Sequence, residues 1–432
     1  MASFSIPLGG LNADSTALNT IANNLSNMST TAFKSQTTNF SDLFYQQIGT
    51  SGSGDAIQVG EGVKVASNST DFTQGSYNTS GTTTSDVALD GSGFFVVSNG
   101  SGSDLYTRNG AFTQDTSGNL VTTDGLAVMG YPAVNGVVNT NAPLTAISIP
   151  LTGQEQPGQA TTSFSMTANL DSAATSGDSF PGTVTVYDSL GAAHTATITY
   201  TQTGTNTWSY SAALPATDYT SGVSTPVTGT LTFDSSGNLS TVAQTAPTVV
   251  TTTTVGSSAG DISSIPLSFS GLADGAADLS ISWNLLSSAG KPTISQEDTA
   301  SAQSAAPANG HAAGVCTGFT IGSDGTVSAT YSNGQAQAVG QLALANVTNL
   351  QGLTLQGNGE YATTLSSGEA TIGLSGTGGL GTIKDSALEE SNVNISAEFS
   401  DLIVAQRAFE ANSKAITTFD SVTQETINMI HS

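Results

Sequence analysis

The sequence predicts a mainly β protein with nested domains, whose two ends are helical and pair with each other. Three observations favour this fold class. Ser, Thr, Gly and Val dominate the middle of the 432-residue chain, and only 9% of the residues are charged. Apolar residues recur at helical spacing near both ends. Proline is absent from Leu8 to Tyr131 and from Ala308 onward, so both ends are free to be helical.

The N-terminal segment 1–30 is predicted to contain a helix with a coiled-coil type of seam. Leu11, Leu18 and Leu25 are seven residues apart, and Ile21 and Met28 fall on the adjoining position of the same repeat. Apolar residues at these two positions of a heptad form one continuous stripe along a helix. We expect this stripe to contact another helix.

The C-terminal segment 395–432 shows a second apolar stripe. Its members lie three, four or seven residues apart, the spacing that places residues on one face of a helix. They are Ile395, Phe399, Leu402, Phe409, Ile416 and Phe419. No other helical pattern lies near this segment in sequence, so the N-terminal helix is its simplest partner.

The body between the two ends is predicted to be antiparallel β structure built from hairpins. Residues 112–120 (FTQDTSGNL) and 233–239 (FDSSGNL) share one design, in which a strand ending near Phe is followed by Asp and then by Ser-Gly-Asn. An Asp side chain stabilises such a turn, and Gly accepts a positive φ. Residues 321–334 supply two more turns of this kind.

A composition shift predicts that one domain is inserted into another. Between Pro150 and Ala313 the Thr and Ser content rises, most prolines occur, and Lys291 is the only Lys or Arg. We predict an outer β domain over 150–313, with a barrel or sandwich fold and with residues 302–314 as a linker. An inner β domain is predicted over 76–149 and 314–374, and a connector over 31–75 and 375–394.

Pairing of the two terminal helices buries too little apolar surface to offset the entropy of ordering them. We therefore hypothesise that both helices are loose in the isolated chain and become ordered when they pack against other copies in a polymer.

Net charge and composition exclude several classes of partner. The formal net charge is −25, from 32 acidic and 7 basic residues, which disfavours nucleic acids and anionic membranes. The chain has no run of 18 apolar residues and no secretory signal pattern at its start, so neither membrane insertion nor a cleaved signal is expected. The single cysteine, Cys316, is expected to be a small buried side chain.

No catalytic, cofactor or metal site is predicted. Residues 256–260 (GSSAG) match a nucleophile elbow in form, but the flanking residues do not resemble a strand leading into a helix. Residues 376–381 (GTGGLG) lack the helix that follows a dinucleotide fingerprint and are interpreted as a bend. His194, His311 and His431 show no metal-ligand spacing. Trp208 and Trp283 are expected to anchor the core of the outer domain.

Several segments resemble the bacterial flagellar axial proteins, the family of rod and hook subunits. Residues 18–36 resemble the N-terminal signature of that family, with Asn24 and Lys34 at characteristic places. Residues 87–97 and 106–131 are similar to its β core. Residues 387–416 resemble its C-terminal signature, including Glu389, Asn392 and Asn412. Residues 186–200, 331–349 and 355–370, together with the long insertion, favour the hook type over the rod type.

The resemblance implies a structural, non-enzymatic subunit that polymerises into a curved hollow tube, the joint between motor rod and filament. It implies export through the flagellar type III apparatus, an extracellular location, and four partners besides further copies: the distal rod protein, the hook-filament junction protein, the hook cap and the export gate. Phe40 and Phe44 resemble the element recognised at that gate; alternatively, they lie one helical turn apart in a packed face. A distal rod protein, a β-rich surface adhesin and a secreted hydrolase that uses Ser258 stay open as alternatives.

Overall fold

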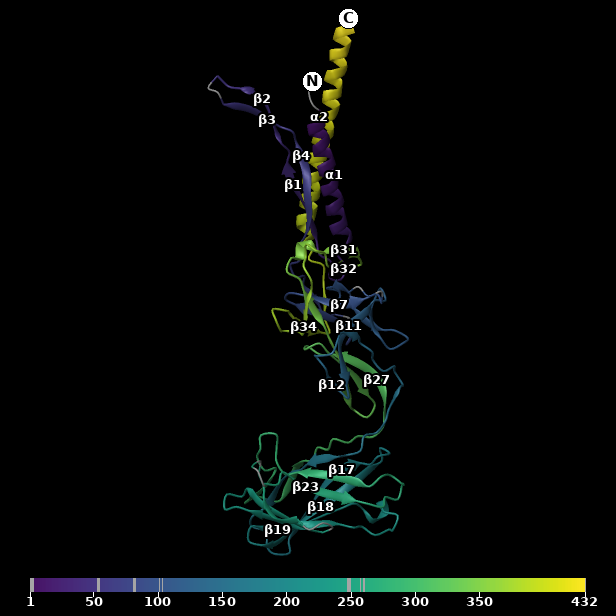
Figure 1. The fold of residues 1–432 in the computed structure, drawn as a ribbon, viewed down its shortest axis with the longest axis vertical. Helices are drawn as coiled ribbons and strands as arrows, with labels where there is room; N and C mark the ends of the chain where they lie inside the picture. Colours follow the sequence, from purple (N-terminus) through teal and green to yellow (C-terminus); the bar gives the residue numbers. More distant parts are fainter. Residues whose placement is uncertain are drawn as a thin grey trace. The chain divides into compact units, whose positions relative to one another are not determined.

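In the computed structural model the chain forms two compact units, each with its own core (Figure 1). The structure describes residues 4–52, 55–80, 83–100, 102, 104–246, 250–256, 258 and 261–431. The first unit comprises residues 1–151, 318–330 and 336–432, and the second comprises 152–317 and 331–335. The second unit is therefore built mainly from one long insertion in the sequence of the first.

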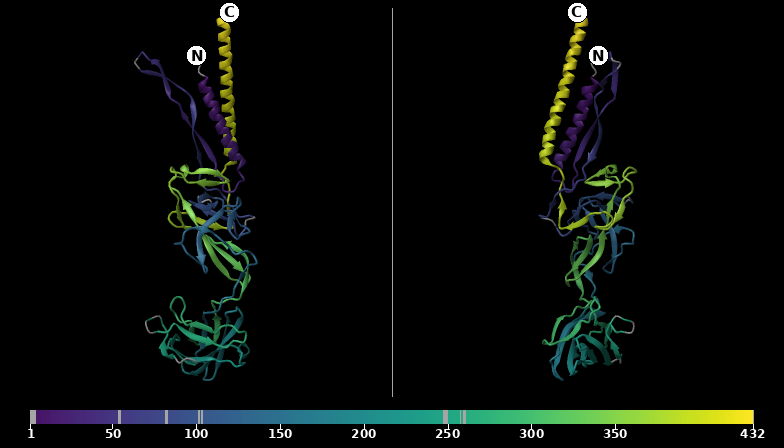
Figure 2. Two further views of the ribbon diagram at one scale, coloured as in Figure 1. Left: turned by 45° about the vertical axis from the view of Figure 1, so that its right-hand side comes forward. Right: turned by 90° about the vertical axis from the view of Figure 1, so that its left-hand side faces the viewer.

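The two long helices belong to the first unit. α1 spans Ser5–Ser26 and α2 spans Ile395–His431. Pro7 lies in the first turn of α1, where its missing N–H is tolerated. Asn394 caps α2, because its Oδ1 accepts hydrogen bonds from the backbone N–H groups of Ser396 and Ala397. The predicted pairing of the terminal helices is confirmed: α1 and α2 lie side by side (Figure 2).

Strands of the first unit form a long antiparallel arm beside α1 and a β core. In the arm, β1 pairs with β4 and β2 pairs with β3. In the core, strands are hydrogen-bonded in the order β28-β29-β11-β7-β8-β32-β31. The arm comprises β1 (Gln36–Asp42), β2 (Tyr45–Thr50), β3 (Ala56–Gly60) and β4 (Val63–Thr70). The core comprises β5 (Tyr77–Asn78), β6 (Val87–Asp90), β7 (Phe94–Ser98), β8 (Asp104–Thr107), β9 (Phe112–Gln114), β10 (Leu120–Thr122), β11 (Ala127–Val134), β12 (Val137–Val138), β13 (Thr145–Ala146), β28 (Thr326–Tyr331), β29 (Ala336–Leu342), β30 (Leu344–Asn346), η2 (Leu350–Gly352), β31 (Thr354–Gly357), β32 (Glu360–Ala362), β33 (Thr371–Gly373), β34 (Thr382–Asp385) and β35 (Leu388–Glu389).

The second unit contains a six-stranded antiparallel sheet in the order β17-β18-β19-β20-β21-β22 and two three-stranded sheets, β15-β24-β23 and β25-β16-β26. Its elements are β14 (Glu155–Gln156), β15 (Ser163–Ser165), β16 (Thr167–Asp171), β17 (Ser179–Tyr187), β18 (Ala193–Gly204), β19 (Thr207–Ala213), η1 (Ala216–Asp218), β20 (Val227–Phe233), β21 (Leu239–Ala246), β22 (Val250–Thr254), β23 (Ser264–Phe269), β24 (Leu279–Asn284), β25 (Ile294–Glu297) and β26 (Ala302–Ala305). β27 (Gly314–Ile321) runs from this unit into the first.

Each unit has an apolar core made by alternating residues of its strands. Trp208 and Trp283 lie in the core of the second unit, where the Tyr210 ring packs edge-on against Trp283. Their predicted role as core anchors is confirmed, and Cys316 is buried as predicted. Phe95 and Phe112 pack edge to face in the core of the first unit.

The predicted Asp-based turns are confirmed. Asp115 joins β9 to β10, and its Oδ1 accepts hydrogen bonds from the N–H groups of Ser117 and Asn119. Asp234 makes the same two bonds, to Ser236 and Asn238, between β20 and β21. The prediction of a linker over 302–314 is wrong, because Ala302–Ala305 form β26, which pairs with β16. The Ser/Ala-rich composition suggested a linker, although small residues also suit an exposed strand.

Candidate functional site at the chain termini

The two terminal helices run antiparallel and touch through small and polar residues. Along α1 the buried positions are Pro7, Gly10, Ala13, Thr20 and Asn24. A Cβ atom on Gly10 would lie 2.6 Å from Nδ2 of Asn412, so a larger residue there would displace that side chain. Small residues let two helix axes approach closely.

Asparagines hold the register between the helices. Nδ2 of Asn412 donates to Oδ2 of Asp14 at 2.8 Å, and Nδ2 of Asn24 donates to Oε1 of Glu398 at 2.9 Å. Asn24 also exchanges two hydrogen bonds with the backbone of Gln36, which ties β1 to the helices. Near the other end of α1, the rings of Phe4 and Phe419 pack edge to face at 6.1 Å. Polar contacts and one aromatic pair therefore help to set this pairing.

The predicted apolar seams are only partly covered in the single chain. On α1, Leu11, Leu18, Ile21 and Leu25 are half-buried, and Met28 is 47% exposed. On α2, Leu402, Phe409, Ile416 and Phe419 are half-buried, whereas Ile395 and Phe399 are 46% and 53% exposed. Further exposed apolar residues on the helices are Ile6, Leu8, Ile403, Val404, Val422, Ile427 and Met429.

The last three turns of α2 extend past the start of α1. Phe419 lies opposite Phe4, and residues 421–429 are all exposed. Val422 in that stretch is 55% exposed. Apolar side chains exposed in this way are typical of a surface that binds another protein.

A groove of about 380 Å³ lies between α1, β1 and α2. Its apolar wall is made by Ile21, Phe40, Val404 and Ala408. Phe40 lies on β1 and is 48% exposed, while Phe44 follows that strand and is 87% exposed. The alternative that these two rings lie one helical turn apart is wrong, since this segment is extended.

A buried ionic network joins both terminal segments to the β core. Nζ of Lys34 lies 2.6 Å from Oε1 of Glu389, and Nε of Arg108 lies 3.3 Å from Oε2 of the same carboxylate. Burial lowers the pKa of Lys34, and the hydrogen bond with Glu389 opposes that shift. Asn392 adds hydrogen bonds to the backbone of Ser35 and Asp71. Sequence reasoning singled out Lys34, Glu389 and Asn392 by resemblance, but it did not foresee that they meet.

The remaining sequence candidates do not assemble into a catalytic site in the part of the chain that the structure describes. Ser258 is exposed, and its backbone N–H donates to the Asp261 carboxylate. Residues 257, 259 and 260 of the GSSAG segment lie outside the described residues. Among the helices described, none is long and apolar enough to cross a membrane. His194 lies in an acidic cluster of the second unit that sequence spacing could not reveal.

Four family models match the chain in succession. They describe the flagella basal body rod protein (residues 6–34), the flagellar hook protein FlgE/F/G D1 domain (88–168), the flagellar basal body protein FlaE D2 domain (160–311) and the flagellar basal body rod FlgEFG protein C-terminal region (384–429). The order of these matches follows the nesting seen in the structure, with a D2 match inside the second unit.

Relatives of known identity match nearly the full length. The flagellar hook protein FlgE of Escherichia coli is 36% identical, with 99% of each chain covered. That of Salmonella typhimurium is 35% identical over 99% of this chain and 100% of the relative, and that of Treponema pallidum is 33% identical over 98% of each. The crystal structure of the Helicobacter pylori flagellar hook protein FlgE2 shares the fold, with a TM-score of 0.53 at 14% identity, over 73% of this chain and all of that one. With such relatives along its whole length, the chain belongs to the family of bacterial flagellar hook proteins, the structural subunits of the hook.

Proposed function

We propose that copies of this chain assemble helically into a short, curved, hollow tube that transmits torque from the rod to the filament. The observation that supports the proposal is the uncovered apolar surface of α1 and α2. In the polymer, Met28, Ile395 and Phe399 and the half-buried seam residues pack against the same helices of neighbouring copies. Burying an exposed Phe or Leu contributes roughly 1.5–3 kcal/mol.

The groove between α1, β1 and α2 is part of the same proposal. Its occupant is a second copy of the chain, because helical assembly places identical apolar helix faces next to one another. An apolar side chain of a neighbouring α2 fits the wall made by Ile21, Phe40 and Val404. Every subunit makes the same contact with its neighbours. A small gain in binding free energy at each contact therefore adds up along the tube.

Each domain takes a separate task in this proposal. The terminal domain, 1–30 and 395–432, forms the inner tube, and the connector, 31–75 and 375–394, links it to the inner β domain of 76–149 and 314–374. The outer β domain, 150–313, makes weak and hydrated contacts that are remade as the tube turns. Ser- and Thr-rich strands suit such contacts.

The proposed partners beyond further copies are the distal rod protein, the hook-filament junction protein, the hook cap and the flagellar type III export gate. The chain passes that gate without a cleaved signal and acts outside the cell. Exposed Phe40 and Phe44 are the proposed export element, since a segment read before folding needs no place in a folded core.

Substitution of Phe399 tests the assembly proposal. Phe399→Gln removes an apolar side chain that is half-exposed in the single chain, so the monomer is expected to fold normally while polymerisation falls at least tenfold. Val223→Gln, which changes an exposed apolar residue of the second unit, is the matched control and is expected to polymerise like the wild type. Equal polymerisation of both variants, measured by sedimentation of tubes, would contradict the proposed seam.

A further inference from the structure

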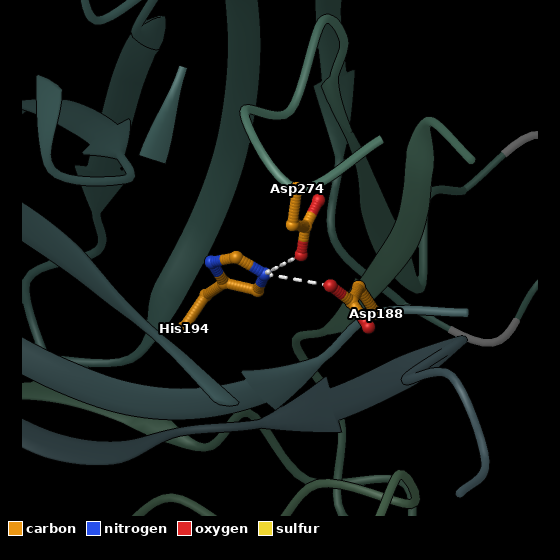
Figure 3. Close-up of side chains that lie close together, drawn as sticks. All are labelled: Asp188, His194 and Asp274. Carbon is orange, nitrogen blue, oxygen red and sulfur yellow. Dashed lines mark hydrogen bonds and ion pairs between the residues drawn. The ribbon is translucent and has the colours of Figure 1, made fainter. Parts of the chain in front are cut away.

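Three potential ligand residues meet in the second unit (Figure 3). Asp188 follows β17, His194 lies near the start of β18, and Asp274 lies in the loop between β23 and β24. One ligand atom of each residue falls within 4.8 Å of the other two. Residues from three separate parts of the chain therefore converge on one point.

The distances between the donor atoms fit a single bound cation. Nε2 of His194 lies 3.0 Å from Oδ2 of Asp188 and 3.7 Å from Oδ2 of Asp274. Ligand atoms that each lie about 2.0–2.2 Å from one Zn²⁺ ion are separated by roughly 3.0–3.5 Å. A small shift of Asp274, the more exposed of the two carboxylates, completes that geometry.

Backbone groups orient both carboxylates toward the histidine. Oδ1 of Asp188 accepts hydrogen bonds from the N–H groups of Leu190 and Ala192, at 2.8 and 2.9 Å. Oδ1 of Asp274 accepts one from the N–H of Ala276 at 3.0 Å. In each residue the other oxygen, Oδ2, is left to face His194.

A further carboxylate orients the imidazole ring of His194, as is common for histidines that bind metals. Nδ1 of His194 lies 2.9 Å from Oδ2 of Asp218, a residue of η1. Metal-binding histidines commonly donate their second ring N–H to a carboxylate, which fixes the ring and leaves the other nitrogen as a ligand. With the Nδ1–H group donating to Asp218, an unprotonated Nε2 faces both Asp188 and Asp274.

The histidine cannot donate to every carboxylate that faces it. Nε2 carries at most one proton, so it donates to one carboxylate while two face it. The side chain of Asp188 is completely buried and that of His194 is 9% exposed. Asp188, Asp218 and Asp274 all face one imidazole, so the cluster keeps an excess of negative charge even when the imidazole is protonated. A divalent cation would remove that excess.

We propose that the second unit binds one divalent transition cation of the Zn²⁺ type through Asp188 Oδ2, His194 Nε2 and Asp274 Oδ2, with Asp218 as a positioning residue. Mixed imidazole and carboxylate donors suit such ions better than Ca²⁺. The exposed side of Asp274 leaves coordination positions for water. The bound ion links the β17–β18 hairpin to the loop before β24, and this link stabilises the second unit against unfolding.

Calorimetric titration of the chelator-treated, full-length protein with Zn²⁺, Mn²⁺ and Ca²⁺ separately tests this site. We expect one Zn²⁺ per chain, weaker binding of Mn²⁺ and the weakest of Ca²⁺. Asp274→Asn, at an exposed position that tolerates change, is expected to weaken Zn²⁺ binding at least tenfold. Asp234→Asn removes the same charge from a turn of the same unit and is expected to bind like the wild type.

Two further readouts locate the ion. Zn²⁺ is expected to raise the Tm followed by the fluorescence of Trp208 and Trp283, in the wild type and in Asp234→Asn but not in Asp274→Asn. Mn²⁺ is expected to broaden the proton resonances of His194 rather than those of the other two histidines. No stoichiometric Zn²⁺ binding by the wild type, equal affinities of the two variants, or broadening at another histidine would overturn the proposal.

Discussion

Nζ of Lys34 lies 2.6 Å from Oε1 of Glu389, although 355 positions separate the two residues in the sequence. Lys34 follows α1, and Glu389 precedes α2. Arg108, from the β core, occupies the other oxygen of the carboxylate. This contact holds the bases of both terminal helices against the β core of the first unit.

Loss of the Glu389 charge is expected to destabilise the first unit. Glu389→Gln leaves two buried cations without a carboxylate, which costs about 3–5 kcal/mol when a buried pair is broken. Glu390→Gln, at the exposed neighbour, is the control and should cost under about 1 kcal/mol. Guanidinium unfolding followed by the α-helical circular dichroism signal measures the first unit, which contains α1 and α2, and tryptophan fluorescence, which reports only the second, should not change. Equal midpoints for both variants would argue against the joint.

Alkaline pH is expected to destabilise the same unit through Tyr361. Burial raises the pKa of Tyr361 to about 12, whereas an unfolded tyrosine titrates near 10. The unfolded chain therefore loses this proton first, and the stabilisation present below pH ~10 is lost as the pH rises toward 12. Tyr361→Phe keeps the ring contacts with Phe72 and Phe94 and lacks the ionisation.

The midpoint of alkaline unfolding should consequently move to higher pH in Tyr361→Phe. Tyr45→Phe, at an exposed ring of the β2–β3 arm, serves as the control and should leave the midpoint unchanged. Circular dichroism as a function of pH records the midpoint. A shift of the same size in both variants would show that the buried hydroxyl is not the cause.

Hydrogen exchange distinguishes ordered from loose terminal helices. We expect amides of residues 421–431 to exchange fast in isolated chains, because α1 does not cover them, and to become protected at least a hundredfold in tubes. Amides of β7 and β11 in the core serve as an internal reference with equal protection in both states. Strong protection at both chain ends in the monomer would refute the idea that assembly orders them.

Substitution of Phe40 should reduce export of the chain more than it reduces the stability of the assembled tube. Phe40→Ala is expected to reduce the secreted protein severalfold and to lower the thermal stability of preformed tubes by a smaller factor, since Phe40 is one of several residues that line the groove. Ile57→Ala, at another exposed apolar residue of the β arm, is the control and should be secreted normally. Parallel losses of secretion and tube stability in Phe40→Ala would remove the export role and leave Phe40 as a packing residue.

The sequence predicted the pairing of the terminal helices because each helix lacked a local partner. It did not predict that small and polar residues take part in the interface. Heptad spacing selected Leu11, Leu18 and Leu25, and the contact with α2 also involves Gly10 and Asn24. Close approach of two helices requires small side chains, and these carry no apolar signal in a periodicity analysis.

The long-range polar clusters could not be predicted from the sequence, for a different reason. Lys34, Arg108 and Glu389, or Asp188, His194 and Asp274, come together only through the fold, and no spacing in the sequence marks them. Local turn chemistry was predictable, as at Asp115 and Asp234, because the hydrogen bonds there span two to four residues.

Electron microscopy of the purified protein is the most direct test of assembly through the terminal helices. The full-length chain is compared with a version lacking residues 1–30 and 395–432, in moderate and in high salt. Screening shortens the range of repulsion between copies of net charge −25 from about 10 Å at 0.1 M to about 3 Å at 1 M salt. We predict tubes from the full-length chain alone, more abundant in high salt. Tubes from the truncated version, or no tubes from a full-length chain whose helices are well ordered, would contradict the account.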